Sequence, residues 1–357
     1  MRIDKDFEGG NIRVTQISGD TVHLEAELRD TQTDWFYWAF RVEGAAGRTI
    51  RFDFNQKLRV GYYGAAVSHD LRAWKWAGEP FADYTGFTYS FGQAENTAFF
   101  CHDLRYSTAQ FQSLCQDLAL PAQTLATSER GRPIPFVEFG SGENVLLLTS
   151  RHHACESTGT YVLEGALRSL ARKPIAGFTT IAVPFVDLDG VVDGDQGKNR
   201  RPHDHNRDYG EKPLYASVRW IQALAAERPV VFALDLHSPW HFGGRNDVGH
   251  GVRKDGLCTA TQARFGELLT QQCRQCPDSF QYDTKNDLAV GEEWNVPQDG
   301  GSPTSFSAFF SCHPGTEFAL SLETPYYGTT DNIVTQERLR ALGGCVAGAL
   351  RALAAER

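Results

Sequence analysis

Two side chains that can bind a metal ion together stand three positions apart in the segment Val145–Glu156. His153 and Glu156 come after the apolar run Val145–Leu148, among polar residues that a buried strand would not carry for stability alone. On a tight turn after a strand, both side chains can face one point. An imidazole nitrogen and a carboxylate oxygen that meet in this way fill two positions of a tetrahedral zinc site. The H-x-x-E pattern is common by chance, so the chain must supply further ligands.

A third ligand is expected at the end of another apolar run. The run Val230–Leu234 is followed by Asp235 and His237. His237 is therefore the predicted third ligand, with His153 and Glu156 as the first two. A carboxylate near a ligating imidazole commonly accepts its free N–H, which makes Asp235 an outer partner. Because alternate residues of a strand share a face, Asp235 could instead contact another ligand or the substrate.

A general base is predicted at the end of a fourth apolar run. Glu323 ends the run Phe318–Leu322. A carboxylate beside a metal-bound water can take its proton and later pass it to a leaving amine. Glu317 is the competing residue, but it precedes the run, so we expect it to face solvent.

A glycine-rich, basic loop follows the apolar run of residues 178–183. It carries four cations, Lys198, Arg200, Arg201 and Arg207. Because arginine can bind a carboxylate through two parallel hydrogen bonds, the loop predicts a site for an anionic part of the substrate. A solvated basic loop is the competing interpretation. His203 and His205 in the same loop are further candidates for metal ligands.

The elements that must position these residues alternate along the chain. Apolar runs are separated by amphipathic stretches that predict helices at Thr158–Arg172, Tyr215–Glu227, Thr259–Gln275 and Gln336–Arg357. This alternation indicates an α/β fold with a mixed, mostly parallel sheet flanked by helices. In such sheets the ligand lies outside the carboxyl ends of the strands, where the candidate residues fall.

The first part of the chain reads as all-β. Residues 14–28 alternate around a Gly-Asp turn, a hairpin signature, and residues 34–42, 49–55 and 58–67 predict further strands. Several short strands at this spacing indicate an antiparallel β-sandwich. A helix-like segment follows at Ser107–Leu120. We therefore divide the chain into a β-sandwich domain, residues 1–112, and a catalytic domain, residues 113–357.

Four tryptophans of the first part are candidates for a carbohydrate-stacking platform, namely Trp35, Trp38, Trp74 and Trp76. Packing in the core and at its edge is the favoured interpretation. Among the eight cysteines, Cys273 and Cys276 form a lone C-x-x-C, which we interpret as structural. Cys155 is interpreted as a small buried residue rather than a nucleophile.

The composition and net charge of the chain limit which partners and which cellular location we expect. The chain has 357 residues, 41% of them hydrophobic and 22% charged, with a net charge of −9 and a pI near 5.7. An acidic chain of this kind argues against nucleic acid or an anionic membrane as the main partner. There is no apolar run of membrane-spanning length and no apolar signal segment at the N-terminus. We expect a cytoplasmic protein with reduced thiols.

Taken together, the ordered motifs resemble the M14 zinc carboxypeptidase family, and within it the cytosolic carboxypeptidase branch. The matching segments, each with the family pattern in parentheses, are Thr149–Glu156 (T-S-R-x-H-x-x-E), Asp189–Val191 (D-G-V), Asp204–Arg207 (D-L-N-R), Asp235–His237 (D-L-H) and Ser321–Glu323 (T-L-E). Phe7–Asn11 and Asp34–Trp38 resemble the N-terminal β-sandwich of that branch. The resemblance covers most of the chain and implies hydrolysis of the C-terminal peptide bond of peptides or proteins.

The resemblance also implies residue roles. It implies one zinc ion per chain, bound by His153, Glu156 and His237. Glu323 would be the base and proton shuttle, and Asn206 and Arg207 would hold the terminal carboxylate of the substrate. The basic loop suggests an acidic C-terminal residue such as glutamate.

The chain departs from the family in the loop after Asp189. Where the family has an arginine that polarises the scissile carbonyl, this chain has Gly197. Lys198, Arg200 or Arg201 takes over that role, or zinc alone does. Tyr326 and Tyr327 are the candidates for the substrate-capping tyrosine of digestive members. Two other functions stay open: a zinc-dependent deacylase of N-acyl amino acids, and a non-catalytic protein that binds peptide or carbohydrate.

Overall fold

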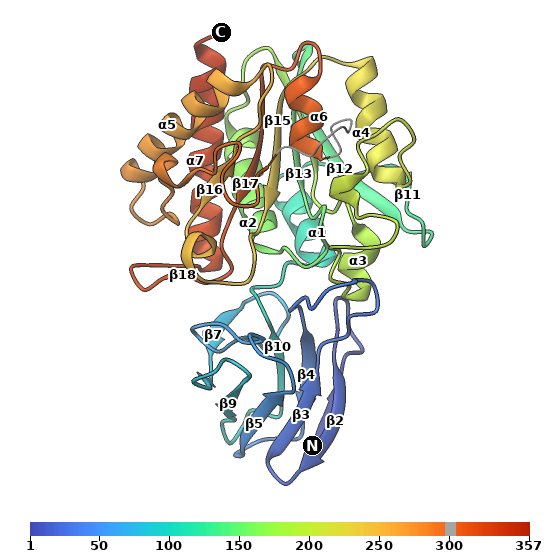
Figure 1. The fold of residues 1–357 in the computed structure, drawn as a ribbon, viewed down its shortest axis with the longest axis vertical. Coiled ribbons are helices and arrows are strands. Elements are labelled where there is room, and N and C mark those ends of the chain that lie inside the picture. The colour runs from blue at the N-terminus through green and yellow to red at the C-terminus, as the bar shows by residue number, and fades with distance from the viewer. Residues whose placement is uncertain (297–304) are drawn as a thin grey trace.

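The computed structural model describes residues 1–296 and 305–357, and it has a β-rich part followed by a larger α/β part (Figure 1). Strands of the first part form two five-stranded sheets, with the orders β1-β4-β10-β6-β7 and β2-β3-β5-β9-β8. Their bounds are β1 (Arg2–Asp4), β2 (Arg13–Ser18), β3 (Thr21–Glu25), β4 (Ala39–Glu43), β5 (Thr49–Phe54), β6 (Ala65–Ser68), β7 (Lys75–Ala77), β8 (Glu79–Pro80), β9 (Gly86–Ser90) and β10 (Thr97–Cys101).

Alternating side chains hold these two sheets together. Along β5, Ile50, Phe52 and Phe54 are buried, while the residues between them face outward. The Phe52 ring lies 5.2 Å from that of Phe40 and 5.3 Å from that of Phe100, which come from the other sheet. This packing confirms the predicted N-terminal β domain. Its strand pairs are antiparallel except for the parallel pair β3–β5.

Of two local predictions for the β-rich part, one is confirmed and the other is wrong in part. The hairpin around the Gly19–Asp20 turn is confirmed as the pair β2–β3. The strand predicted over residues 58–67 is wrong for its first half, because Leu58 and Gly64 have positive φ angles of 56° and 78° that interrupt an extended backbone.

The tryptophans of this part mostly serve packing. Trp38 and Trp74 are buried in the core. The indole N–H of Trp76 donates to the carbonyl of Val334 at 2.8 Å. Trp38, Trp74 and Trp76 are therefore engaged in packing and form no common platform.

The second part is built on a seven-stranded sheet with the order β11-β12-β14-β13-β15-β17-β16. The four central strands, β14, β13, β15 and β17, are mutually parallel, and β12 and β16 flank them in antiparallel pairs. The bounds are β11 (Gln123–Thr127), β12 (Pro133–Gly140), β13 (Asn144–Ser150), β14 (Phe178–Val183), β15 (Val230–His237), β16 (His250–Val252) and β17 (Phe318–Glu323). The small pair β18 (Gly328–Thr329) and β19 (Asn332–Ile333) follows. The predicted mixed, mostly parallel sheet is confirmed.

Helices cover both faces of this sheet, with α5 and α7 on one side and α4 and α6 on the other (Figure 1). The helices are α1 (Thr108–Asp117), α2 (Thr158–Arg172), α3 (Leu188–Asp193), α4 (Ala216–Glu227), α5 (Thr259–Gln275), α6 (Phe306–Cys312) and α7 (Gln336–Ala355). The four helices predicted from the sequence in this part are confirmed within two residues of their ends. None of the described helices has the length and apolar character needed to cross a membrane.

Two contacts show how the chain packs, one between helices of the α/β part and one between the two parts. Helices α2 and α7 approach closely because Gly165 and Gly343 face each other's backbone, where a Cβ atom on either would clash. Between the two parts of the chain, the Gln196 side chain accepts a hydrogen bond from the backbone N–H of Tyr37 at 2.9 Å and donates one to its carbonyl at 2.8 Å. The loop after α3 is thereby fixed to the β-rich part. The proposed division after residue 112 falls within α1.

Candidate metal centre and active site

The predicted ligands meet at the carboxyl ends of neighbouring parallel strands. His153 and Glu156 lie in the turn after β13, and His237 is the last residue of β15. Glu323 ends β17 and is the direct register partner of His237, so the two side chains point to the same face of the sheet. The sheet thus brings together residues that are 170 positions apart in the chain (323 − 153).

His153, Glu156 and His237 form a group that can hold a metal ion. One ligand atom from each lies within 4.8 Å of the others, and all three residues are buried. The Nδ1 atom of His153 lies 2.9 Å from Oε1 of Glu156, and Nδ1 of His237 lies 2.7 Å from Oε2. Two imidazoles and a carboxylate that leave one side open are the donor set of a catalytic metal site.

The charge of Glu156 is maintained although the residue is fully buried. Burial alone would raise the pKa of its carboxyl, but the charges of His153, Lys198 and His237 outweigh it and hold the pKa well below its usual range. The carboxylate is therefore ionised, as a metal ligand must be.

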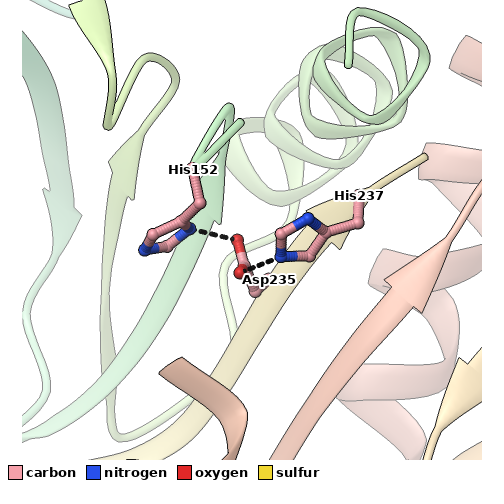
Figure 2. Close-up of side chains that lie close together, drawn as sticks. All are labelled: His152, Asp235 and His237. Carbon is pink, nitrogen blue, oxygen red and sulfur yellow. Dashed lines mark hydrogen bonds and ion pairs between the residues drawn. The ribbon is translucent and has the colours of Figure 1, made fainter. Parts of the chain in front are cut away.

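Asp235 lies on the side of His237 that faces away from Glu156. Its carboxylate bridges two imidazoles, with a hydrogen bond to Nδ1 of His152 at 2.8 Å and another to Nε2 of His237 (Figure 2). Thr149 donates a third hydrogen bond to it at 2.8 Å. These bonds leave Nδ1 of His237 directed at Glu156. The sequence raised two possibilities for Asp235, and the structure joins it to His237 and to a second histidine.

The structure contains a second group that can hold a metal ion, made of His152, Asp235 and His237. Both nitrogens of His152 are already hydrogen-bonded, to Asp235 and to the hydroxyl of Tyr209 at 2.7 Å. His152 is also completely buried, whereas a catalytic metal needs an open position. The first group suits chemistry better, because His153 and His237 line a cavity.

Asp204 is a residue to which the sequence alone assigned no role beside the metal. Its Oδ1 lies 3.6 Å from Nε2 of His153, the nitrogen that faces away from Glu156. Asp204 thus lies on the side of His153 that faces away from Glu156, as Asp235 does for His237, but it is too far from the ring nitrogen for a hydrogen bond. The signal for it was its place in the D-x-N-R motif, two residues before Asn206.

A cavity of about 440 Å³ opens beside the metal ligands. It is lined by, among others, His153, Lys198, Asp204, Asn206, Arg207, His237, Lys254 and Glu323. The buried Oε2 atom of Glu323 has no hydrogen-bond partner among the described residues, so it is free to accept a proton. The cavity therefore holds an unpaired base, several cations and the metal ligands.

Lys254 is a second residue of the cavity that the sequence did not reveal. Its ammonium group donates to Oδ1 of Asn295 at 2.6 Å. Burial, together with the charge of Arg207, lowers the pKa of Lys254. It follows the short edge strand β16 and belongs to no motif, so only the folded chain reveals it.

Arg200 and Arg201 were predicted to bind the substrate, but the structure does not bring them into this cavity. Arg200 is ion-paired with Asp187 at 2.7 Å and Asp30 at 3.0 Å. Both arginines line a different cavity, of about 520 Å³, on another side of the loop. The carboxylates of Asp30, in the β-rich part, and of Asp187, just before α3, hold Arg200 in that position. The sequence alone does not show that these carboxylates compete with a substrate for the arginine.

The two tyrosines considered as substrate caps also lie outside the cavity of about 440 Å³. Tyr327 donates a hydrogen bond to the carbonyl of His102 at 3.1 Å. The hydroxyl of Tyr326 lies 3.8 Å from Sγ of Cys155. Neither tyrosine is among the described residues that line this cavity.

The two histidines of the basic loop are engaged elsewhere. Nε2 of His203 lies 2.6 Å from a carboxylate oxygen of Asp208, and the ring of His205 stacks on that of Tyr215. Neither belongs to a described group of residues that could hold a metal ion. Glu317, the competitor for the role of base, is exposed, as expected.

Comparison with known proteins agrees with the resemblance seen in the sequence. Residues 3–102 match the family described as the cytosolic carboxypeptidase N-terminal domain. Human cytosolic carboxypeptidase 2 is 25% identical over 348 residues, which cover 80% of this chain and 38% of the human protein. This chain therefore corresponds to less than half of that relative's length.

Solved structures share the fold over the whole chain. A metallo-carboxypeptidase from Pseudomonas aeruginosa, in complex with (2-guanidinoethylmercapto)succinic acid, has a TM-score of 0.80 at 19% identity and covers 100% of both chains. A metallo-carboxypeptidase from Burkholderia cenocepacia has a TM-score of 0.80 at 18% identity and covers 99% of both. By sequence the chain is similar to the cytosolic carboxypeptidases, and it shares the fold of solved metallo-carboxypeptidases.

Proposed function

We propose that this chain is a zinc-dependent metallocarboxypeptidase that hydrolyses the C-terminal peptide bond of peptides or proteins. The observation that carries the proposal is the convergence of His153, Glu156 and His237 within 4.8 Å, beside a cavity that His153, His237 and Glu323 line. A base next to three metal ligands is of use to a hydrolase and of no use to a protein that only binds.

Zinc is the metal we propose for His153, Glu156 and His237. Two imidazoles and one carboxylate are typical ligands of catalytic zinc, which keeps its fourth position for water or substrate. When bound there, zinc acts as a Lewis acid and lowers the pKa of water to about 7. The buried carboxylate of Asp235 fixes the orientation of His237 through a hydrogen bond, while Asp204 places a negative charge 3.6 Å from Nε2 of His153.

The remaining residues of the cavity would position the substrate and move protons. Glu323 takes a proton from the attacking water and passes it to the leaving amine. Asn206 and Arg207 bind the terminal carboxylate, with the charge-assisted hydrogen bonds that arginine favours. Lys198 stabilises the negative charge that develops on the oxygen of the scissile carbonyl, in place of the arginine absent at Gly197.

Lys254 supports a preference for an acidic C-terminal residue. It lines the same cavity as Arg207, and its ammonium group, bonded to the neutral side chain of Asn295, has no carboxylate partner within ion-pair distance among the described residues. A carboxylate on the substrate side chain would supply the missing counter-charge. Glutamate or aspartate at the C-terminus therefore fits the cavity better than an aliphatic residue.

Human cytosolic carboxypeptidase 2 is named for the cytosol, and we propose a cytoplasmic location here.

The test combines metal analysis with peptide hydrolysis. We expect one zinc ion per purified chain, release of glutamate from acetylated peptides that end in glutamate, and slower release of leucine from matched peptides. Glu323→Gln should keep the zinc and lose about 1,000-fold in kcat, which lies within the range for removal of a general base. The proposal fails if the zinc-loaded protein cleaves no peptide, or cleaves only N-acyl amino acids, which would instead identify a deacylase.

A further inference from the structure

Two tryptophans from distant parts of the chain form one wall of the active-site cavity. Trp35 lies just before β4 in the β-rich part, and Trp240 lies three residues after the end of β15. Their rings are 4.5 Å apart at an angle of 35°, and both residues line the cavity of about 440 Å³. Trp35 is almost completely buried, whereas Trp240 is 42% exposed. An exposed indole on a packed one is a surface to which an apolar group can add.

Lys198 contacts both the tryptophan pair and a metal ligand. Its ammonium nitrogen lies 5.0 Å from the centre of the Trp35 ring, within the range of a cation–π contact, and 2.6 Å from Oε1 of Glu156. Lys198 therefore stands between the tryptophan pair and the metal centre. The cation–π contact of Lys198 thus joins the aromatic wall to the part of the cavity where the chemistry would occur.

The tryptophan pair is held in place by its surroundings. The Phe36 ring packs 5.3 Å from Trp35 and 5.2 Å from Trp240, and it stacks on His241 at 4.5 Å. The hydrogen bonds of Gln196 to the backbone of Tyr37 tie the Lys198 loop to the same segment. A rigid aromatic surface needs little reordering when a ligand binds, which favours its use in recognition.

We propose that Trp35 and Trp240 form a subsite for a large apolar or aromatic side chain on the residue before the scissile bond. This inference rests on the proposed carboxypeptidase activity. With the terminal carboxylate at Asn206 and Arg207, and the scissile carbonyl between the metal ligands and Lys198, the acyl part of the substrate leaves the cavity past Lys198. The tryptophan pair is the surface that it meets there. The β-rich part thus contributes to specificity directly, through Trp35.

The test uses acetylated dipeptides that end in glutamate and carry phenylalanine or glycine before it. We expect kcat/KM of the zinc-loaded protein to be about tenfold higher for phenylalanine than for glycine, since burial of an aromatic side chain is worth about that factor. Trp240→Ala should bring the ratio close to one, and Trp240→Phe should keep most of it. Leu257→Ala removes an apolar side chain that is 67% exposed and outside the cavity, and it should leave the ratio unchanged.

Binding provides a second measurement that does not depend on catalysis. Calorimetric titration of the inert Glu323→Gln protein should give a Kd for the phenylalanine peptide about tenfold below that for the glycine peptide. Trp35 packs where the two parts of the chain meet, so Trp35→Ala could disturb folding there. The milder variant Trp35→Phe is therefore used, and it should weaken this difference. Equal kcat/KM and equal Kd for the two peptides, or a ratio that survives Trp240→Ala, would overturn the subsite and leave the carboxypeptidase activity standing. Absence of cleavage of every peptide would overturn both.

Discussion

The ammonium nitrogen of Lys198 lies 2.6 Å from Oε1 of Glu156, a carboxylate with no exposed surface. Burial alone would lower the pKa of Lys198, but the charges of Glu156 and Glu323 outweigh it and raise that pKa above its usual value. The lysine is therefore protonated in the cavity. It stands next to Gly197, the position where the family pattern has an arginine, and it is the cation best placed to act on a substrate carbonyl.

Replacement of Lys198 by methionine should lower kcat by about 100-fold, because the transition state loses its charged hydrogen-bond donor. Lys198→Arg should restore much of the loss. Zinc content, measured by elemental mass spectrometry, should be the same in all three proteins. A fall in zinc content that accounts for the lost activity would instead make Lys198 a structural partner of Glu156.

Asp235 should control metal affinity more than catalysis. Asp235→Asn removes the charge that His152 and His237 share, and outer partners of this kind change metal affinity by about 10- to 100-fold. Asp204→Asn should have a smaller effect, since Asp204 lies 3.6 Å from His153. Competition with a chromophoric chelator measures both affinities. Equal losses in the two variants would contradict the difference in geometry.

Lys254 should determine the preference for an acidic C-terminal residue. Lys254→Leu should reduce kcat/KM for peptides that end in glutamate by about 100-fold, because a buried charged hydrogen bond is worth up to about 3 kcal/mol. Peptides that end in leucine should be cleaved as well as before or better. The ratio of the two kcat/KM values is the measurement, and an unchanged ratio would place the acidic preference elsewhere.

The sequence predicted those site residues whose positions are each set by the end of a single strand. His153 lies three residues after β13, and His237 and Glu323 are the last residues of β15 and β17, so the rule for parallel sheets was enough to bring them to one edge. Their ordered motifs also carried the family resemblance. The fold followed from the same runs, because a buried parallel strand is apolar on both faces.

Residues whose position depends on competition between partners could not be predicted in this way. Lys198, Arg200 and Arg201 look equivalent in the sequence of the loop. Only the folded chain shows that carboxylates of Asp30 and Asp187 hold Arg200 away from the cavity, while Lys198 reaches Glu156. Trp35 was likewise grouped with the packing tryptophans, because its neighbour Trp240 comes from another part of the chain.

A pair of stacked histidines between the two parts of the chain should make the protein sensitive to acid. His102 and His241 are buried, and their rings lie 4.8 Å apart. Neither ring nitrogen of His102 has a hydrogen-bond partner among the described residues. Burial, with a contribution from the charge of Arg59, lowers the pKa of both histidines well below the usual value. Both are therefore neutral in the folded protein at neutral pH.

The replacement His102→Phe tests this effect, since a phenyl ring can fill the same place beside Phe36 and His241. Above about pH 6.5 a histidine is mostly neutral in the unfolded chain too, so it has little effect on the pH dependence of stability. Below about pH 6.5 the unfolded chain binds a proton that buried His102 does not, and the free energy of unfolding falls by about 1.4 kcal/mol per pH unit. Urea unfolding at about pH 7.5 and about pH 5.5 should therefore show the variant gaining about 1.4 kcal/mol relative to the unmodified protein at the lower pH. If the two stability curves are displaced by the same amount at every pH, the substitution changes packing alone and His102 does not titrate on unfolding.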